Sequence, residues 1–312
     1  MRQGLESSSA FSLLFSSSPQ ISSRRMSAFR ILAPAKLFSP WLLDALRATL
    51  GSEISVEAYA REEESRNLVA SGSFDLAALP DTMLFPLRRA DLLLPLASAL
   101  PAPLPAEPQF LHHYFDPANQ YAWPFGFTLL AIGGQGTAAE VPSHWKELAD
   151  GRIPFRPPSS PLFSRFLFAA LAHGFPPLPG YLGSQAAPAA IPQGGNARIE
   201  VDFVQQLEAR GSGPGWIVRI PAEGSWIRLF HWTIPRGCSN PKRAGAALPE
   251  MFRPGNLGRY ASEALLAVTT REARQEVPTQ LLHNPNVYPA ESILDRSVFA
   301  RVDWLPPSSA AG

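Results

Sequence analysis

The stretch FDPANQYAWPFGFTLLAIGG, residues 115–134, is a polar turn that runs into a long aromatic and apolar strand. Turn formers lie at both ends of the strand, FDPANQ before it and GGQG after it. Pro124 has no N–H group to donate to a sheet, so it belongs at a strand edge or where the chain crosses between sheets. The stretch is therefore either an ordinary buried strand with an edge proline or a hinge that leads from one domain into another.

A second long aromatic segment, SWIRLFHWTIP at residues 225–235, also ends at a proline. The two segments bracket the middle of the chain, which favours the hinge. We predict two domains, residues 28–124 with 233–312 and residues 125–232. The predicted hinge residues are Pro124, Phe125 and Trp232.

The composition is that of a globular protein without a strong net charge. Of the 312 residues, 46% are hydrophobic, which is ample for packed cores in one large or two ordinary domains. Lys and Arg total 27 against 26 Asp and Glu, so no net field attracts nucleic acid or an anionic membrane. Cys238 is the single cysteine, which excludes an internal disulfide framework and a cysteine metal cluster. We predict a small-molecule binder with no nucleic-acid partner, no metal and no cofactor.

The first 27 residues are rich in serine and contain arginine, and we expect a leader or a disordered N-terminus there. The apolar patch Ala10–Phe15 is shorter than the roughly 7 to 15 residues of a secretory signal core. Three alternatives stay open: an atypical leader, a true start at Met26, or a protein that is not exported. The sequence has no apolar run of about 18 residues, so we expect no membrane span.

Residues 29–79 alternate between strand and helix patterns. The predicted strands are residues 29–33, 54–58 and 74–79, and the predicted helices are residues 40–50 and 61–71. This β-α-β-α-β order predicts a parallel sheet covered by helices, and ligands in such sheets bind beyond the carboxyl ends of the strands. Lys36, Asp81 and Thr82 follow two of those ends and are candidate ligand-binding residues. The charged cluster REEES, residues 61–65, is typical of a solvated helix face.

The second predicted domain contains a helix at Pro161–His173, opened by Ser159 and Ser160. Predicted strands follow at Glu200–Val204, Trp216–Pro221 and Trp226–Pro235. From Asn240 onward we expect mainly helices.

Four segments in this order resemble one known family. They are SFDLAALPDTMLFPLRR (73–89), FDPANQYAWPFGFTLLAIGG (115–134), SHWKELADGRIPF (143–155) and EGSWIRLFHWTIPRGCSNPKRAGAALPEMFRP (223–254). The chain resembles the bacterial extracytoplasmic solute-binding proteins of ABC transporters, and within them the spermidine/putrescine-binding branch. The resemblance implies an α/β fold of type 2 with two lobes, each a mixed sheet flanked by helices, and a ligand cleft between them. It also implies hinge closure, a monomer, a membrane permease as partner, and a periplasmic or otherwise extracytoplasmic location.

The residues that would bind a polyamine are largely replaced in this sequence. A polyamine site needs carboxylates for the ammonium groups and aromatic rings for the methylene chain. The family's tryptophan and aspartate of the return segment fall on Arg228 and Phe230, and its paired acids fall near Pro161 and Ser164. Other aromatic positions fall near Pro34 and Leu37, and one falls near Asp202.

We therefore expect an anionic or carboxylate-bearing solute in place of a polyamine. Arg228 and the helix start at Ser159 and Ser160 would attract such a group. The candidate ligand-binding residues are Lys36, Asp81, Thr82, Ser159, Ser160, Ser164, Asp202, Arg228 and Phe230. The alternative for Arg228 is a solvent-facing position on an edge strand.

No catalytic motif accompanies these residues. The sequence has no GxSxG, HExxH, GxGxxG or P-loop pattern, and Cys238 has no strong activating neighbour. We predict a binding protein without catalytic residues. The alternative of a different class is a diverged cytosolic two-lobe protein that senses a metabolite or catalyses an unknown reaction.

Overall fold

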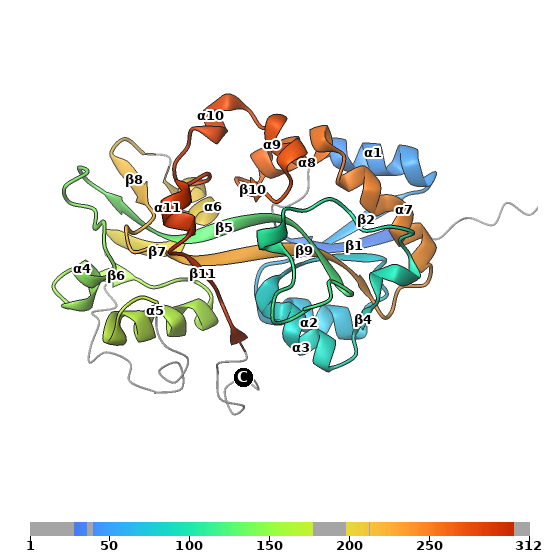
Figure 1. The fold of residues 1–312 in the computed structure, drawn as a ribbon, viewed down its shortest axis with the longest axis horizontal. Coiled ribbons are helices and arrows are strands. Elements are labelled where there is room, and N and C mark those ends of the chain that lie inside the picture. Colours follow the sequence, from blue (N-terminus) through green and yellow to red (C-terminus); the bar gives the residue numbers. More distant parts are fainter. Residues whose placement is uncertain (1–27, 36–39, 177–197, 212, 303–312) are drawn as a thin grey trace, which may run out of the picture.

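Two long strands, β5 (Ala122–Gln135) and β9 (Trp226–Pro235), run antiparallel through the molecule and join its two halves (Figure 1). The computed structural model describes residues 28–35, 40–176, 198–211 and 213–302. The first part of β5 pairs with β9, and its last residues pair instead with strands of the other half. One strand thus belongs to two sheet regions, as the two aromatic segments of the sequence predicted.

The first lobe contains the predicted β-α-β-α-β unit. Its elements are β1 (Phe29–Pro34), α1 (Pro40–Leu50), β2 (Ile54–Tyr59), α2 (Glu62–Ser71) and β3 (Leu76–Pro80). The three strands are parallel, in the order β2-β1-β3, and β9 continues the sheet antiparallel to β3. The strand ends therefore meet at one edge of this sheet, where the sequence predicted ligand contacts.

The second lobe is built on the far end of β5. The strands β7 (Ile199–Phe203) and β8 (Trp216–Arg219) pair antiparallel with β5, and β6 (Phe155–Arg156) lies parallel to β7. Its helices are α4 (Lys146–Ala149), α5 (Pro161–His173) and α6 (Val204–Arg210). The helix α5 has the predicted bounds, with Ser160 at its N-cap and Pro161 in its first turn.

The remaining elements connect and cover these two sheets. After β3 come α3 (Asp81–Arg89), β4 (Leu93–Leu94), η1 (Leu96–Ser98) and η2 (Pro108–Phe110). After β9 come α7 (Pro241–Met251), α8 (Pro254–Glu263), β10 (Ala267–Val268), α9 (Arg271–Gln275), α10 (Thr279–Leu282), α11 (Glu291–Leu294) and β11 (Val298–Phe299). The strand β11 pairs with the start of β9, so the chain returns to the junction after building the helices above it (Figure 1).

The proline of the opening stretch lies at an irregularity in β5. The pairing register with β9 shifts between Pro124 and Gly126, so Phe125 is an extra residue in the strand. Such a bulge tolerates the missing N–H group of Pro124 inside a sheet. The Phe125 ring stacks on Trp232 of β9 at 5.1 Å between centroids, and both side chains are fully buried. The crossing is therefore a bent, aromatic-packed pair of strands.

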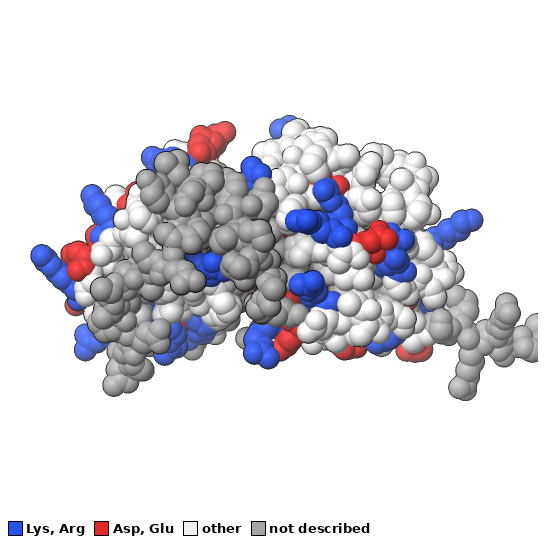
Figure 2. Space-filling view, turned by 90° about the horizontal axis from the view of Figure 1, so that it is seen from below, with Lys and Arg blue, Asp and Glu red and all other residues white. Residues whose placement is uncertain are grey.

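Charges of both signs are interspersed on the surface. In Figure 2, Lys and Arg side chains lie beside Asp and Glu side chains at several places on the same face. This arrangement agrees with the near-zero net charge.

Within the described residues, no helix is long and apolar enough to cross a membrane.

Candidate functional site

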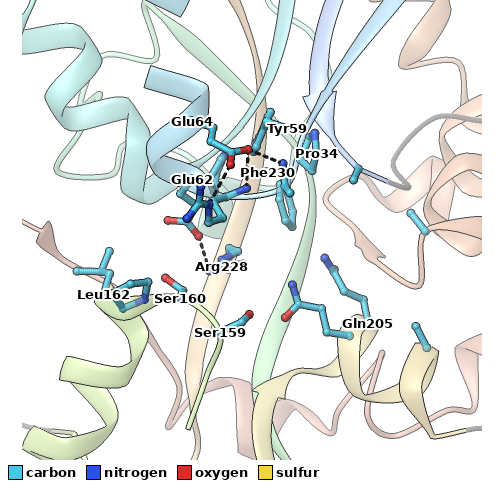
Figure 3. A pocket seen from close by; sticks show the side chains of 18 of the residues that line it. Pro34, Tyr59, Glu62, Glu64, Ser159, Ser160, Leu162, Gln205, Arg228 and Phe230 are labelled. Atoms are coloured by element: carbon cyan, nitrogen blue, oxygen red, sulfur yellow. Dashed lines mark hydrogen bonds and ion pairs between the residues drawn. The ribbon is translucent and has the colours of Figure 1, made fainter. Parts of the chain in front are cut away.

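A cavity of about 1070 Å³ lies between the two lobes, where β9 passes from one to the other. Figure 3 shows its side chains converging from both sides, with Tyr59, Glu62 and Pro34 from the first lobe and Ser159, Ser160 and Gln205 from the second. Arg228 and Phe230 of β9 lie between these walls. Neither lobe could form the cavity alone, because each contributes one wall.

The first wall is made by the carboxyl ends of parallel strands. Pro34 ends β1, Tyr59 ends β2 and Pro80 ends β3, and all three line the cavity. The Tyr59 hydroxyl donates a hydrogen bond to the Ala78 carbonyl at 2.9 Å, and burial raises the pKa of this phenol well above its usual value. Tyr59 is therefore a neutral, fixed aromatic surface.

The second wall is made by the starts of α5 and α6. The Ser159 hydroxyl donates to the Asp202 carboxylate at 3.2 Å, whereas the Ser160 side chain makes no capping hydrogen bond. The first turn of a helix also leaves backbone N–H groups without intrahelical acceptors. The buried Oε1 of Gln205 has no hydrogen-bond partner in the described part of the chain. This wall thus offers several polar groups to a bound molecule.

Arg228 forms the floor of the cavity and is buried, with 6% of its surface exposed. Its guanidinium is ion-paired with Glu62, whose carboxylate also accepts a hydrogen bond from the Thr82 hydroxyl at 2.8 Å. The guanidinium carbon lies 3.6 Å from the ring centroid of Phe203 and 4.6 Å from that of Phe163. Glu62 belongs to the first lobe and the two rings to the second, so Arg228 links the lobes.

The remaining charges of the cavity are mostly paired. Its charged lining residues are Arg61, Arg165, Arg210, Arg228, Glu62, Glu64 and Glu263. Arg61 pairs with Glu64 at 2.9 Å, and Arg210 pairs with Asp202 at 2.8 Å. Among the described residues, Arg165 has no ion pair and no hydrogen bond. The half-buried Arg165 is therefore the cation that is most available to an anionic solute.

Comparison with solved structures identifies the architecture. A spermidine/putrescine ABC transporter substrate-binding protein from Streptococcus pneumoniae matches with a TM-score of 0.73 and 19% identity, over 88% of this chain and 94% of that chain. A binding protein from A. tumefaciens in complex with agropinic acid matches with a TM-score of 0.63 and 12% identity, over 89% and 94% of the two chains. Iron-bound HitA from Pseudomonas aeruginosa matches with a TM-score of 0.58 and 12% identity, over 86% and 97%.

The chain has the two-lobe fold of the periplasmic solute-binding proteins. No protein-family model matches the sequence, and no curated protein matches it either. At 12–19% identity the matches show the fold. These three proteins are a spermidine/putrescine transporter component, a binding protein in complex with agropinic acid and an iron-bound protein, so the fold does not select a ligand.

The two-lobe fold brings together four of the predicted ligand-binding residues. Ser159, Ser160, Arg228 and Phe230 all line the cavity. The solvent-facing alternative for Arg228 is wrong, because β9 is an interior strand paired on both sides and the side chain is buried.

The other predicted residues have different positions. Asp81 and Thr82 are buried behind the wall and do not line the cavity, although Thr82 holds Glu62 in place. Ser164 donates to the carbonyl of Pro158 at 2.8 Å, so it stabilises the start of α5. Asp202 pairs with Arg210, while Lys36 lies outside the described residues.

Glu62 is a cavity residue that the sequence interpretation missed. The cluster at residues 61–65 was expected to be a solvated helix face, yet the Glu62 side chain is only 13% exposed. Glu62 is the first residue of α2, and it follows Tyr59, the last residue of β2, by three positions. That position, at a ligand-binding edge of a parallel sheet, was the signal that could have identified it.

No metal centre is evident in this site. Within the described ranges, no group of three or more His, Cys, Asp and Glu side chains is arranged to hold a metal ion.

Proposed function

We propose that this protein is the solute-binding component of an ABC uptake system, which captures a small molecule by closing two lobes around it. The observation that carries the proposal is the cavity of about 1070 Å³, which has one wall on each lobe. This volume suits a small solute, and pockets at domain interfaces are common ligand sites. A permease partner and an extracytoplasmic location are part of the same proposal and are supported by the fold it shares with transport proteins.

The proposed lobes are residues 28–124 with 233–312 and residues 125–232, and Pro124, Phe125 and Trp232 form the hinge between them. Support comes from the pairing of β5, which changes partner from β9 to β7 and β8 along its length. The bulge at Pro124 leaves one residue of the crossing without a regular partner. Bending is expected where the ladder is already interrupted.

The solute that we propose carries a carboxylate or another anionic group, and it is not a polyamine. Glu62, Glu64 and Glu263 are the acids of the cavity, and each has an arginine partner. An ammonium group would therefore compete with an existing ion pair at every acid. Arg165 lines the cavity and has no ion pair or hydrogen bond among the described residues, and the first turn of α5 adds N–H groups that favour an anion. Arg228 is a weaker candidate, because Glu62 already neutralises its charge.

A thermal-shift screen tests this proposal with amino acids, small carboxylates, phosphate, putrescine and spermidine. We expect a carboxylate to raise the unfolding temperature, because a ligand at 100 times its Kd adds about 2.7 kcal/mol to the native state. The Arg165→Ala variant should fold normally and lose most of this response. A micromolar response to putrescine would contradict the proposed solute class, and no response to any compound would count against a small-solute binder.

A further inference from the structure

We infer that Arg228 fills an organic-cation site that the protein builds for itself, and that this side chain closes the site to free amines and guanidines. The inference concerns the floor of the cavity alone. It holds whether or not the protein serves an uptake system, because it rests on contacts within the chain.

The surroundings of the Arg228 guanidinium have the chemistry of a cation receptor. The ring faces of Phe203 and Phe163 lie 3.6 Å and 4.6 Å from the guanidinium carbon, and the two rings stand nearly perpendicular at 87°. The Glu62 carboxylate completes the cage on the side of the first lobe. Aromatic faces and a carboxylate in a desolvated site are the groups that bind ammonium and guanidinium ligands.

The residues of the cage are held in place by contacts that do not involve Arg228. Phe163 and Phe203 are fully buried in the core of the second lobe, and they contact each other at 4.6 Å between centroids. Thr82 holds the second oxygen of Glu62 from the first lobe. Nε of Arg228 has no hydrogen-bond partner among the described residues, so the rings and Glu62 provide its electrostatic stabilisation.

The side chain of Arg228 acts as a tethered ligand. It is attached to β9 next to the cage, so its effective concentration exceeds that of any free amine at ordinary levels. Arg228 also lines the cavity, so removing its side chain would connect the cage to the space that a solute enters. We therefore expect Arg228 to determine specificity by excluding cations from the cage.

Chemical rescue of the Arg228→Ala variant tests the inference. Methylguanidine is the probe, and methylurea, which is neutral and of similar shape, is the matched control. We expect methylguanidine at millimolar concentration to raise the unfolding temperature of the variant saturably, and methylurea to have no such effect. Binding to the variant should be at least about tenfold tighter than any binding to the wild-type protein, whose cage is filled.

Two further variants complete the test. In Arg228→Ala combined with Glu62→Gln, the carboxylate is gone and the rescue should disappear. The Arg165→Ala variant is the control, because it removes a cavity arginine that lies outside the cage. Methylguanidine should not raise the unfolding temperature of this variant. If Arg228→Ala does not fold by itself, the yield of native protein after refolding with each compound is the measurement. Equal effects of methylguanidine and methylurea on Arg228→Ala, in stability or in refolding yield, would overturn the inference.

Discussion

Replacing Glu62 with alanine is expected to lower the free energy of unfolding by about 3–5 kcal/mol, because it leaves the buried Arg228 guanidinium without a counter-ion. The side chains of Glu62 and Arg228 are 13% and 7% exposed, so water cannot replace the lost carboxylate. Urea unfolding followed by circular dichroism measures the change through the shift of the transition midpoint.

Glu64→Ala is the matched control for this prediction. Glu64 lies two residues further along the same helix, and it pairs with Arg61, whose side chain is 77% exposed. We expect a far smaller loss there, because exposed ion pairs contribute little. Exchanging both members of the buried pair, with Glu62→Leu and Arg228→Met together, should cost less than Glu62→Ala alone. If Glu62→Ala and Glu64→Ala lowered the free energy of unfolding equally, the buried Glu62–Arg228 pair would not have the structural role proposed for it.

In the wild-type protein, buried Asp81 should make the free energy of unfolding decrease as pH rises from acidic to mildly alkaline values. We expect this decrease to be smaller in the Asp81→Asn variant. Asp81 is fully buried at the start of α3, and one carboxylate oxygen accepts the Thr82 N–H group at 3.0 Å. Its other oxygen has no hydrogen-bond partner among the described residues. Burial raises the pKa of Asp81 from 3.8 to about 8, with nearby Arg228 opposing the shift and Glu62 adding to it.

The sign of the pH effect follows from the direction of this shift. Between pH 3.8 and about 8, the folded protein keeps a proton on Asp81 that the unfolded chain has lost. Its contribution to stability is fully present below pH 3.8 and decreases as pH rises, by at most about 1.4 kcal/mol per pH unit. We would measure the free energy of unfolding of the wild type and of Asp81→Asn from pH 5 to 8. The difference between the two values at each pH isolates Asp81, because the two proteins share all other titratable groups. If the free energies of unfolding of the two proteins changed in parallel with pH, Asp81 would not hold the proton.

Local patterns predicted most of the fold. The parallel unit of β1, β2 and β3 follows from alternation of strand and helix patterns, and the bounds of α5 follow from the Ser-Pro start at residues 160–161 and the apolar helix after it. The crossing by β5 and β9 followed from two aromatic segments that end at or contain proline. These signals are local, since each depends on residues within one element or its immediate flanks.

The cavity floor could not be predicted in the same way. Its geometry depends on Glu62, Thr82 and Arg228, which are far apart in sequence and come together only in the folded chain. Charge alone predicted that Arg228 would attract anions, whereas the folded chain supplies its own carboxylate. The bulge at Phe125 likewise depends on the register between β5 and β9, which no single segment specifies.

A solute held between two closing lobes should bring those lobes closer together. Pulsed EPR with spin labels on Ala90→Cys in the first lobe and Ala149→Cys in the second, in a Cys238→Ser background, measures the distance across the cavity. Both alanines are exposed, and a pair of labels on Ala48→Cys and Ala90→Cys, within the first lobe, is the control. With the best ligand of the thermal-shift screen at saturation, we predict a shorter distance between the lobes and an unchanged distance in the control pair. An inter-lobe distance that does not change when the ligand is bound would contradict the account.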